Sequence, residues 1–359
     1  MDASNSWCSL QELEPLSQLR DLTLYGLEKV QDSRMAEKAM ISSKCHLGCL
    51  ELNYSANRHT IGTGGAEAEQ QQQQSVTEEV LEKLCPPTCI QNLTLRGGYV
   101  GRRLPDWMCA QASVDFKSLR YLTLENLPCC TQLPDGLCCL PSLELMTIKD
   151  APAIKRIGPQ FQASSSVAAR GSDASTSAPF RKLRRLYLDG LPEWEEWEWN
   201  DCEEHMDVET AIAMPCLERL QIKNCKLSCL PPGLASTKRH TLRELWLYEL
   251  TNLTHVENIP SVVKLDVFDC PELKRISGLS RLQKMRITCC PKLEVLESVP
   301  ALDSLRLEDA TMDTLPEYLR AVHPRYLEMG CNKKLYESSS SPGSSEWKKI
   351  SLIRKRSIN

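Results

Sequence analysis

Cysteine is the residue type in this sequence that most invites a chemical role, because 18 of the 359 residues are Cys. The Cys residues include three C-x-x-x-C pairs: Cys45/Cys49, Cys85/Cys89 and Cys225/Cys229. No C-x-x-C and no matching histidine pair accompanies them, and zinc sites need tighter ligand spacing. The six histidines are scattered, and neither H-E-x-x-H nor G-x-S-x-G occurs. The sequence therefore predicts no metal, no cofactor and no enzymatic activity.

Aromatic and arginine residues that recur every 20 positions indicate binding instead. One such column contains Trp246, Asp266, Arg286 and Arg306, and the next contains Tyr248, Phe268, Thr288 and Glu308. Trp, Tyr and Arg are the usual anchors of protein interfaces. If each column forms lateral neighbours on one sheet face, an aromatic cluster lies exposed beside two arginines. The predicted partner-binding residues are Trp246, Tyr248, Asp266, Phe268, Arg286 and Arg306. The alternative is that they only cover the sheet or meet another part of a larger parent protein.

These columns come from an internal repeat of the form L-x-x-L-x-L-x-x-L, as at Leu242, Leu245, Leu247 and Leu250. In a short strand, alternate residues point to opposite faces, so the leucines face inward and the residues between them face solvent. One unit cannot bury its own apolar face, and stacked neighbours form a parallel sheet. The second apolar residue of each frame marks the repeat at Leu22, Leu50, Leu93, Leu122, Met146, Leu186, Leu220, Leu245, Leu265, Met285, Leu305 and Leu327.

This pattern predicts an α/β leucine-rich-repeat solenoid. We expect a curved horseshoe with a parallel β-sheet on the concave face and irregular loops and short helices on the convex face. Four polar residues three positions after the last strand aliphatic should turn inward: Cys225, Cys270, Cys290 and Asn332. The adjacent pairs Cys129–Cys130, Cys138–Cys139 and Cys289–Cys290 should each contain one buried and one exposed thiol.

The domain organisation follows from the repeat frame. Residues 1–18 form a short lead-in, residues 19–337 hold about 12 repeats, and residues 338–359 form a flexible tail that is Ser-rich and then basic. Insertions stretch the frame at 56–79, 159–179 and 198–213. The first two are predicted to be mobile surface loops, and the third is acidic.

Two short segments carry alternative interpretations. In WEEWEW, Trp194 and Trp197 follow Leu191 at three-residue steps, which predicts packing in the core, while the acidic residues around them could face a basic partner. The tail cations Lys348, Lys349, Arg354, Lys355 and Arg356 could form a nuclear address. The interleaved Ile350, Leu352 and Ile353 could instead be the remnant of another repeat.

Composition narrows the cellular setting. The net charge of −4 gives no electrostatic reason to expect nucleic acid, which needs a strongly basic face. No basic segment followed by an apolar run opens the chain, and no stretch of 18 apolar residues occurs. We therefore expect a cytoplasmic protein with reduced thiols and no membrane span.

Four phrases carry a family resemblance: PLSQLRDLTLYGLEKV (15–30), CPPTCIQNLTLRGGYVGRRLPDWM (85–108), SLELMTIKDAPAIKRIG (142–158) and LRRLYLDGLPEWEEWEW (183–199). Over residues 10–337 the chain resembles the leucine-rich-repeat region of plant intracellular nucleotide-binding leucine-rich-repeat (NLR) disease resistance proteins. The resemblance implies a protein-recognition module of innate immunity that senses a pathogen effector or a guarded host protein. It also implies that the module restrains the receptor's nucleotide-binding switch.

The sequence departs from that family because it lacks a coiled-coil module, a nucleotide-binding module and the G-x-x-x-x-G-K-[ST] phosphate loop. A truncated receptor-like decoy or relic is therefore one alternative. A substrate adaptor of a ubiquitin ligase is another, although residues 1–18 are too short for an adaptor motif. An extracellular receptor domain would need a signal peptide, cysteine-paired caps and a regular 24-residue repeat. These are missing here.

Overall fold

Short parallel strands recur along the chain, one for each repeat frame. The computed structural model describes residues 9–55, 67–109, 113–157, 179–197, 213–235 and 240–358. The chain divides into two units, Met1–Leu183 and Arg184–Asn359. Within unit 1, neighbouring strands pair in parallel in chain order: β1 (Asp21–Tyr25), β2 (Cys49–Asn53), β3 (Asn92–Arg96), β4 (Tyr121–Glu125) and β5 (Leu145–Lys149).

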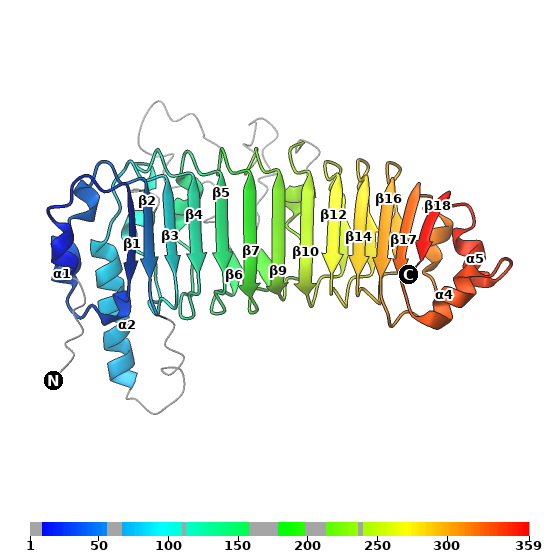
Figure 1. Ribbon diagram of the computed structural model, residues 1–359, viewed down its shortest axis with the longest axis horizontal. Coiled ribbons are helices and arrows are strands. Elements are labelled where there is room, and N and C mark those ends of the chain that lie inside the picture. Colours follow the sequence, from blue (N-terminus) through cyan, green and yellow to red (C-terminus); the bar gives the residue numbers. More distant parts are fainter. Residues whose placement is uncertain are drawn as a thin grey trace, which may run out of the picture. The chain divides into compact units, whose positions relative to one another are not determined.

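Unit 2 repeats the same arrangement with more strands, whose arrows lie side by side in Figure 1. All of its neighbouring pairs in the main sheet are parallel. The strands are β7 (Arg185–Leu191), β9 (Arg219–Cys225), β10 (Glu244–Leu250), β12 (Lys264–Phe268), β14 (Lys284–Thr288), β16 (Ser304–Glu308), β17 (Tyr326–Gly330) and β18 (Lys355–Ile358).

The repeat register predicted from the sequence is confirmed within each unit. In unit 1 the markers pair from Leu22 through Met146, and in unit 2 they pair from Leu186 through Leu327. The markers after Leu22 are buried, as is the aliphatic residue two positions after each. These inward-facing aliphatic residues form a row that we call the inward ladder. Each buried aliphatic side chain contributes about 1.5–3 kcal/mol to the free energy of folding, so the inward ladder stabilises the sheet.

The return side of each repeat consists of turns, short 3₁₀ helices and short strands. In unit 2, three of these strands form a second parallel sheet: β11 (His255–Glu257), β13 (Arg275–Ser277) and β15 (Val295–Glu297). The other short elements are η1 (Leu10–Leu13), η2 (Leu27–Lys29), α1 (Ser33–Lys38), η3 (Ile41–Ser43), η4 (Asp106–Met108), η5 (Asp135–Cys139), β6 (Arg156–Ile157), β8 (Glu196–Trp197), η8 (Pro232–Ala235) and η9 (Glu317–Arg320).

The polar turn position after each main strand is buried where it is Cys. Cys225, Cys270 and Cys290 are at most 8% exposed, which confirms the structural role predicted for them. Burial raises the pKa of the Cys225 thiol to about 11, so it stays protonated at neutral pH. The residue just before this position adopts a left-handed backbone, as at Asn224 and Asp269, which favours Asn, Asp or Gly there.

Asn332 donates its side-chain amide to the Met312 carbonyl of the preceding repeat at 2.7 Å, and it also accepts a hydrogen bond from the Leu335 N–H at 2.9 Å and so caps the helix that follows. In each adjacent Cys pair one thiol is buried: Cys130, Cys138 and Cys290. The other thiol is exposed only at Cys289 and is half-buried in the other two pairs. Trp194 and Trp197 are buried, as predicted, with ring centroids 5.4 Å apart.

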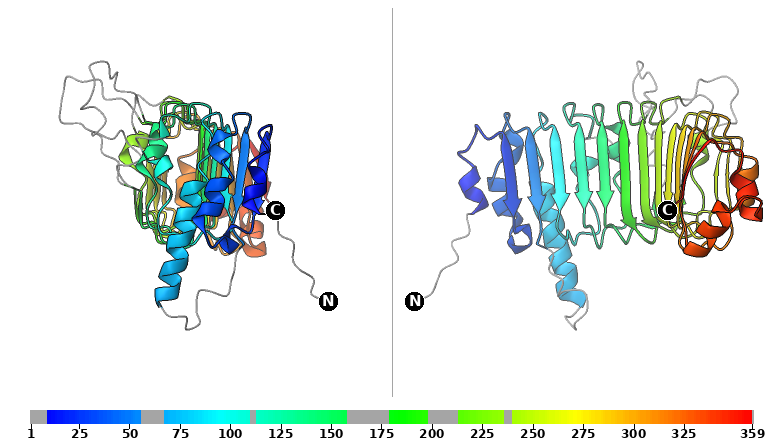
Figure 2. Two further views of the ribbon diagram at one scale, coloured as in Figure 1. Left: turned by 90° about the vertical axis from the view of Figure 1, so that its left-hand side faces the viewer. Right: turned by 45° about the vertical axis from the view of Figure 1, so that its right-hand side comes forward.

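The first insertion differs from the sequence prediction. Residues 56–66 lie outside the described residues, but Glu67–Lys83 form α2, a helix of 17 residues where part of a mobile loop was expected. Val80 and Leu81 in the helix and Leu84 just after it are completely buried. Its N-terminal turns project past the ends of the strands of unit 1 (Figure 2). Glutamine is a good helix former, so the glutamine run continues a helix whose last turns are held by core contacts.

Carboxylates of α2 also tie it to the loop after β3. Glu78 accepts a hydrogen bond from the Arg102 backbone N–H at 2.7 Å, and Glu82 accepts one from the Asp106 N–H at 2.8 Å. These bonds satisfy backbone donors that precede η4 and help to hold α2 against unit 1.

The C-terminal tail is also ordered rather than flexible. Residues Lys333–Ser340 form α4, residues Ser345–Ile350 form α5, and β18 adds a strand beside β17. Figure 2 shows the two helices next to β18 at the C-terminal end of unit 2. Ile350 and Ile353 are at most 3% exposed. Their burial agrees with the alternative interpretation that this segment is the remnant of another repeat.

A buried ion pair fixes this end of unit 2. Lys349 donates to the Leu315 carbonyl at 2.7 Å and lies 3.3 Å from the Glu346 carboxylate, which accepts from the Leu315 N–H at 2.6 Å. The Lys349 side chain is only 6% exposed. Because Lys349 is buried and Lys355 and Arg356 belong to β18, the predicted basic address is not a free tail. The second and third insertions lie outside the described residues, apart from Pro179 and Ala213 at their ends.

Candidate protein-binding surface

The two predicted columns stand side by side on the solvent face of unit 2. Trp246 pairs with Asp266, Asp266 with Arg286, and Arg286 with Arg306 across β10, β12, β14 and β16. Tyr248 pairs with Phe268 in the same way. The structure therefore brings these residues to one face because the inward leucines fix the opposite face.

Trp246 does not stack on the other aromatic side chains. Its ring is instead flanked by cations from the two neighbouring strands: the Arg219 guanidinium carbon lies 4.7 Å from the ring centroid and the Lys264 Nζ lies 5.4 Å from it. Both distances fit cation–π interactions. The indole N–H of Trp246 is buried and has no hydrogen-bond acceptor among the described residues. The ring is thus half-buried between two positive side chains.

Tyr248 and Phe268 form a second aromatic group on the next column. Their ring centroids are 6.4 Å apart and the planes meet at 90°, an edge-to-face contact. Phe268 is 41% exposed, which is unusual for Phe and leaves an apolar edge open to a partner. Burial and then the nearby Asp266 carboxylate raise the pKa of Tyr248 to about 12.

Asp266 lies between the aromatic groups and the arginines. Its side chain is 13% exposed, and the carboxylate is 4.0 Å from the Arg286 guanidinium. Loss of solvent raises the pKa of Asp266, although Arg286 acts in the opposite direction. The removal of water therefore raises the pKa of Asp266 by more than the ion pair with Arg286 lowers it.

Arg306 is engaged elsewhere on the face. It pairs with the Glu308 carboxylate on its own strand and lies 3.4 Å from Glu328 on β17. These two carboxylates neutralise Arg306. Among the described residues, Arg286 has one ion-pair partner, Asp266 at 4.0 Å, and it is therefore less neutralised than Arg306.

Three cations on the column that begins each strand were not predicted from the sequence. Arg219 on β9 and Lys264 on β12 both pair with Glu244 on β10, and Lys264 pairs with Lys284 on β14. The signal was present, because each of these residues comes directly before a marker leucine or methionine and so faces solvent. We call the set Arg219, Trp246, Tyr248, Lys264, Asp266, Phe268, Lys284 and Arg286 the aromatic–cationic surface.

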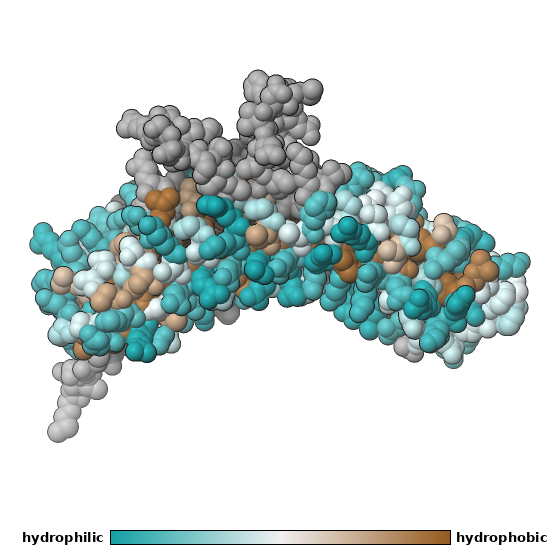
Figure 3. All heavy atoms as spheres, turned by 90° about the horizontal axis from the view of Figure 1, so that it is seen from above, coloured by the Kyte–Doolittle hydropathy of each residue, from teal (hydrophilic) through white to brown (hydrophobic). Residues whose placement is uncertain are grey.

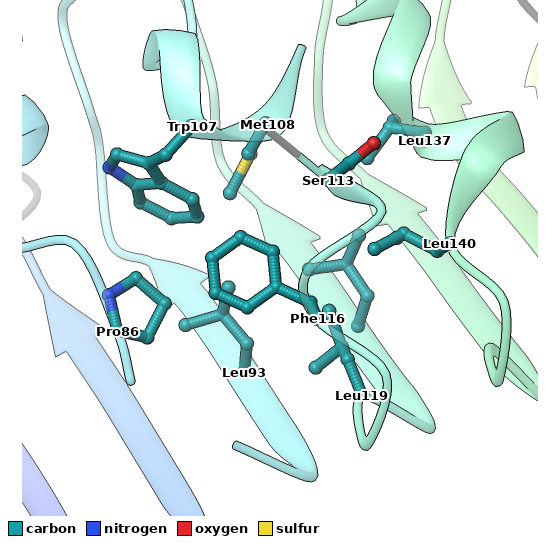
Figure 4. Close-up of a pocket in the computed structure, with 10 residues that line it drawn as sticks. Pro86, Leu93, Trp107, Met108, Ser113, Phe116, Leu119, Leu137 and Leu140 are labelled. Carbon is teal, nitrogen blue, oxygen red and sulfur yellow. The ribbon is translucent and has the colours of Figure 1, made fainter. Parts of the chain in front are cut away.

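Two open hollows elsewhere have about 320 and 310 Å³ of free space, and neither is lined by an exposed aromatic ring. An enclosed apolar pocket in unit 1 has about 10 Å³ of free space and is lined by side chains such as Trp107, Phe116 and Leu137 (Figure 4). That space accommodates at most one water molecule. The edge where the strands begin is mainly hydrophilic, with its apolar residues in separate small patches (Figure 3). Neither feature suggests a ligand site as extensive as the aromatic–cationic surface.

Within the described part of the chain, no group of three His, Cys, Asp or Glu side chains is placed to hold a metal ion. None of the helices in those same ranges has the length and apolar character needed to cross a bilayer.

Comparison with known proteins identifies the repeats. Residues 10–151 match the R13L1/DRL21 leucine-rich repeats. The chain is 31% identical over 209 residues to the putative disease resistance RPP13-like protein 1 of Arabidopsis thaliana, which covers 57% of the chain and 18% of that protein. A second putative disease resistance protein of the same plant is 27% identical over 242 residues, covering 67% of the chain and 15% of that protein.

The similarity to the leucine-rich-repeat region of plant NLR disease resistance proteins that the sequence predicts is therefore confirmed. The chain spans less than a fifth of the length of these two relatives. Among solved structures, the leucine-rich-repeat domain of the type III effector XopL is 18% identical with a TM-score of 0.48, covering 74% of the chain and 82% of that domain.

Proposed function

We propose that this leucine-rich-repeat chain is a protein-recognition module of plant innate immunity and that unit 2 contacts its partner through the aromatic–cationic surface. The partner is a pathogen effector, a guarded host protein or the nucleotide-binding module of a receptor. Its relatives carry disease resistance in their names, which supports the immune setting. We infer that this action takes place in the cytoplasm, and the resemblance to intracellular receptors supports that inference.

One observation carries the proposal: exposed or half-exposed aromatic rings lie beside cations on a rigid sheet face. Interface hot spots are enriched in Trp, Tyr and Arg, and rigid positioning lowers the entropy that binding must offset. The side chains are held by strand register rather than by loops, so they are already arranged before a partner arrives.

The test compares two triple variants of the full chain in pull-downs from infected and uninfected leaf extract. Changing Trp246, Tyr248 and Phe268 together to Ala should remove specific partners while leaving the urea unfolding transition in place. The matched control changes Thr23, Thr123 and Thr147 to Ala, three outward-facing residues of the sheet in unit 1 that are exposed or half-buried. Equal capture by the aromatic variant and by the wild type would refute the proposal.

A further inference from the structure

The cations of the aromatic–cationic surface are only partly neutralised. Arg219 is paired with Glu244 at 2.9 Å. Lys264 and Lys284 have no carboxylate within ion-pair distance among the described residues, and Arg286 has only Asp266 at 4.0 Å. Three cations on neighbouring strands therefore share one carboxylate. They leave a local positive field on a chain whose net charge is −4.

The surrounding carboxylates offset this field only in part. Glu244 is engaged by Arg219, and Glu308 is engaged by Arg306. The Asp266 side chain is mostly buried, and the Tyr248 side chain is hydrogen-bonded to it. An incoming carboxylate would thus meet Lys264 and Lys284 without displacing an existing ion pair, which favours binding.

Aromatic side chains beside cations also suit single-stranded nucleic acid, so the geometry of the rings decides between the two anions. Base stacking needs free ring faces. The Trp246 ring is already flanked by Arg219 and Lys264, and Phe268 meets Tyr248 edge to face. The exposed part of Phe268 offers apolar contact rather than a stacking platform, and this favours a peptide.

We propose that the aromatic–cationic surface binds an acidic segment of a protein partner. Carboxylates of that segment contact Lys264, Lys284 and Arg286, and an apolar side chain of the same segment packs against Phe268. This inference rests on the proposed function and specifies the chemistry of the partner.

The first experiment selects binders from a random phage-displayed peptide library on the full chain. The variant K264E/K284E serves for counter-selection. Enriched sequences rich in Asp and Glu with at least one large apolar residue are the expected result. Enrichment of basic or uncharged sequences, or no enrichment over the counter-selecting variant, would overturn the proposal.

The second experiment measures the affinity of a selected acidic peptide by fluorescence anisotropy. K264E/K284E should weaken binding by at least about tenfold, and raising the salt concentration from 50 to 200 mM should weaken binding to the wild type. The charge-matched control is K274E/K334E, because both of these lysines are exposed and lie outside the main strands. Loss of binding in this control equal to that in K264E/K284E would overturn the proposal.

A single-stranded oligonucleotide of matched charge is the competing probe. The acidic peptide should bind more tightly, and equal or tighter binding of the oligonucleotide would show a generic anion surface and reject the peptide assignment. Failure here is separable from failure of the proposed function. If the Trp246, Tyr248 and Phe268 variant loses its leaf partner while K264E/K284E retains it, the surface binds a partner that is not acidic.

Discussion

The sheets of unit 1 and unit 2 each have an inward ladder of the same kind, but the residues that face outward on their strands differ. In unit 1, the column through the centre of each strand is mostly threonine: Thr23, Glu51, Thr94, Thr123 and Thr147. In unit 2, the same column reads Tyr187, Gln221, Trp246, Asp266, Arg286, Arg306, Glu328 and Ser357. Identical backbone pairing therefore supports a central column of mostly threonine in one unit and a central column of mixed aromatic, charged and polar residues in the other.

Charge compensation differs in the same way. On the face of unit 1, Arg96 pairs with Glu51 at 3.2 Å and Lys149 pairs with Glu125 at 3.2 Å. On the face of unit 2, Lys264 and Lys284 lack such partners among the described residues. The inward residues thus determine the fold, and the outward residues of unit 2 remain available for recognition.

The largest expected effect tests whether the inward ladders are equivalent. Leu265→Ala in unit 2 and Leu122→Ala in unit 1 should each lower the free energy of unfolding by about 2–5 kcal/mol, because each removes a fully buried aliphatic side chain. Urea unfolding followed by circular dichroism measures both. A loss below about 1 kcal/mol at either site would show that the ladders are not equivalent.

The next prediction concerns the C-terminal end of unit 2. Lys349→Met should lower the free energy of unfolding by about 3 kcal/mol, because it leaves the buried Glu346 carboxylate without its cation. The control is Lys348→Met at the exposed neighbouring position, which should change stability by less than about 0.5 kcal/mol. Equal effects of the two substitutions would show that the ion pair does not hold this end.

A smaller effect is expected in the interior of unit 1. The Ser113 hydroxyl is buried beside the apolar pocket and has no hydrogen-bond partner among the described residues. Ser113→Ala should therefore raise the free energy of unfolding by about 1 kcal/mol without changing partner capture. Destabilisation would mean that the hydroxyl is satisfied in solution, for example by one water molecule.

The smallest stability effect is expected at Asp266. Desolvation raises the pKa of Asp266, so Asp266 binds a proton more readily in the folded chain than in the unfolded chain. At neutral pH the ionised Asp266 carboxylate therefore destabilises the fold. Asp266→Asn should stabilise the chain by about 0.5 kcal/mol or less at pH 7, and the difference should vanish as the pH falls below the ordinary range of Asp. It should also tighten binding of the acidic peptide. Destabilisation at pH 7 together with weaker binding would refute this assignment.

The main-strand register was predictable because it follows from one strict pattern. Alternating aliphatic residues place every marker from Leu22 to Leu327, and the same alternation places Trp246 and Phe268 on the outward face. The strand β18 was missed because Arg356 stands where a marker leucine would be expected. Helix α2 was missed because a glutamine run has no apolar period, and the apolar residues Val80 and Leu81 near its end and Leu84 just after it are too few to predict its buried side.

Details of the surface depended on contacts that periodicity does not encode. The repeat frame predicts which residues neighbour Trp246 on the adjacent strands, but it does not predict that Arg219 and Lys264 flank its ring. It also does not predict the edge-to-face contact between Tyr248 and Phe268. Side-chain length and local charge decide these contacts once the backbone register is set.

Site-specific photo-crosslinking tests the central claim most directly. A photo-crosslinking amino acid replaces Phe268 in one full-length protein and Thr123 in another, and both are irradiated in leaf extract containing the captured partner. The difference between the two sheet faces predicts adducts with that partner at position 268 and none at position 123. Adducts at position 123, or equal yields at the two positions, would contradict the account.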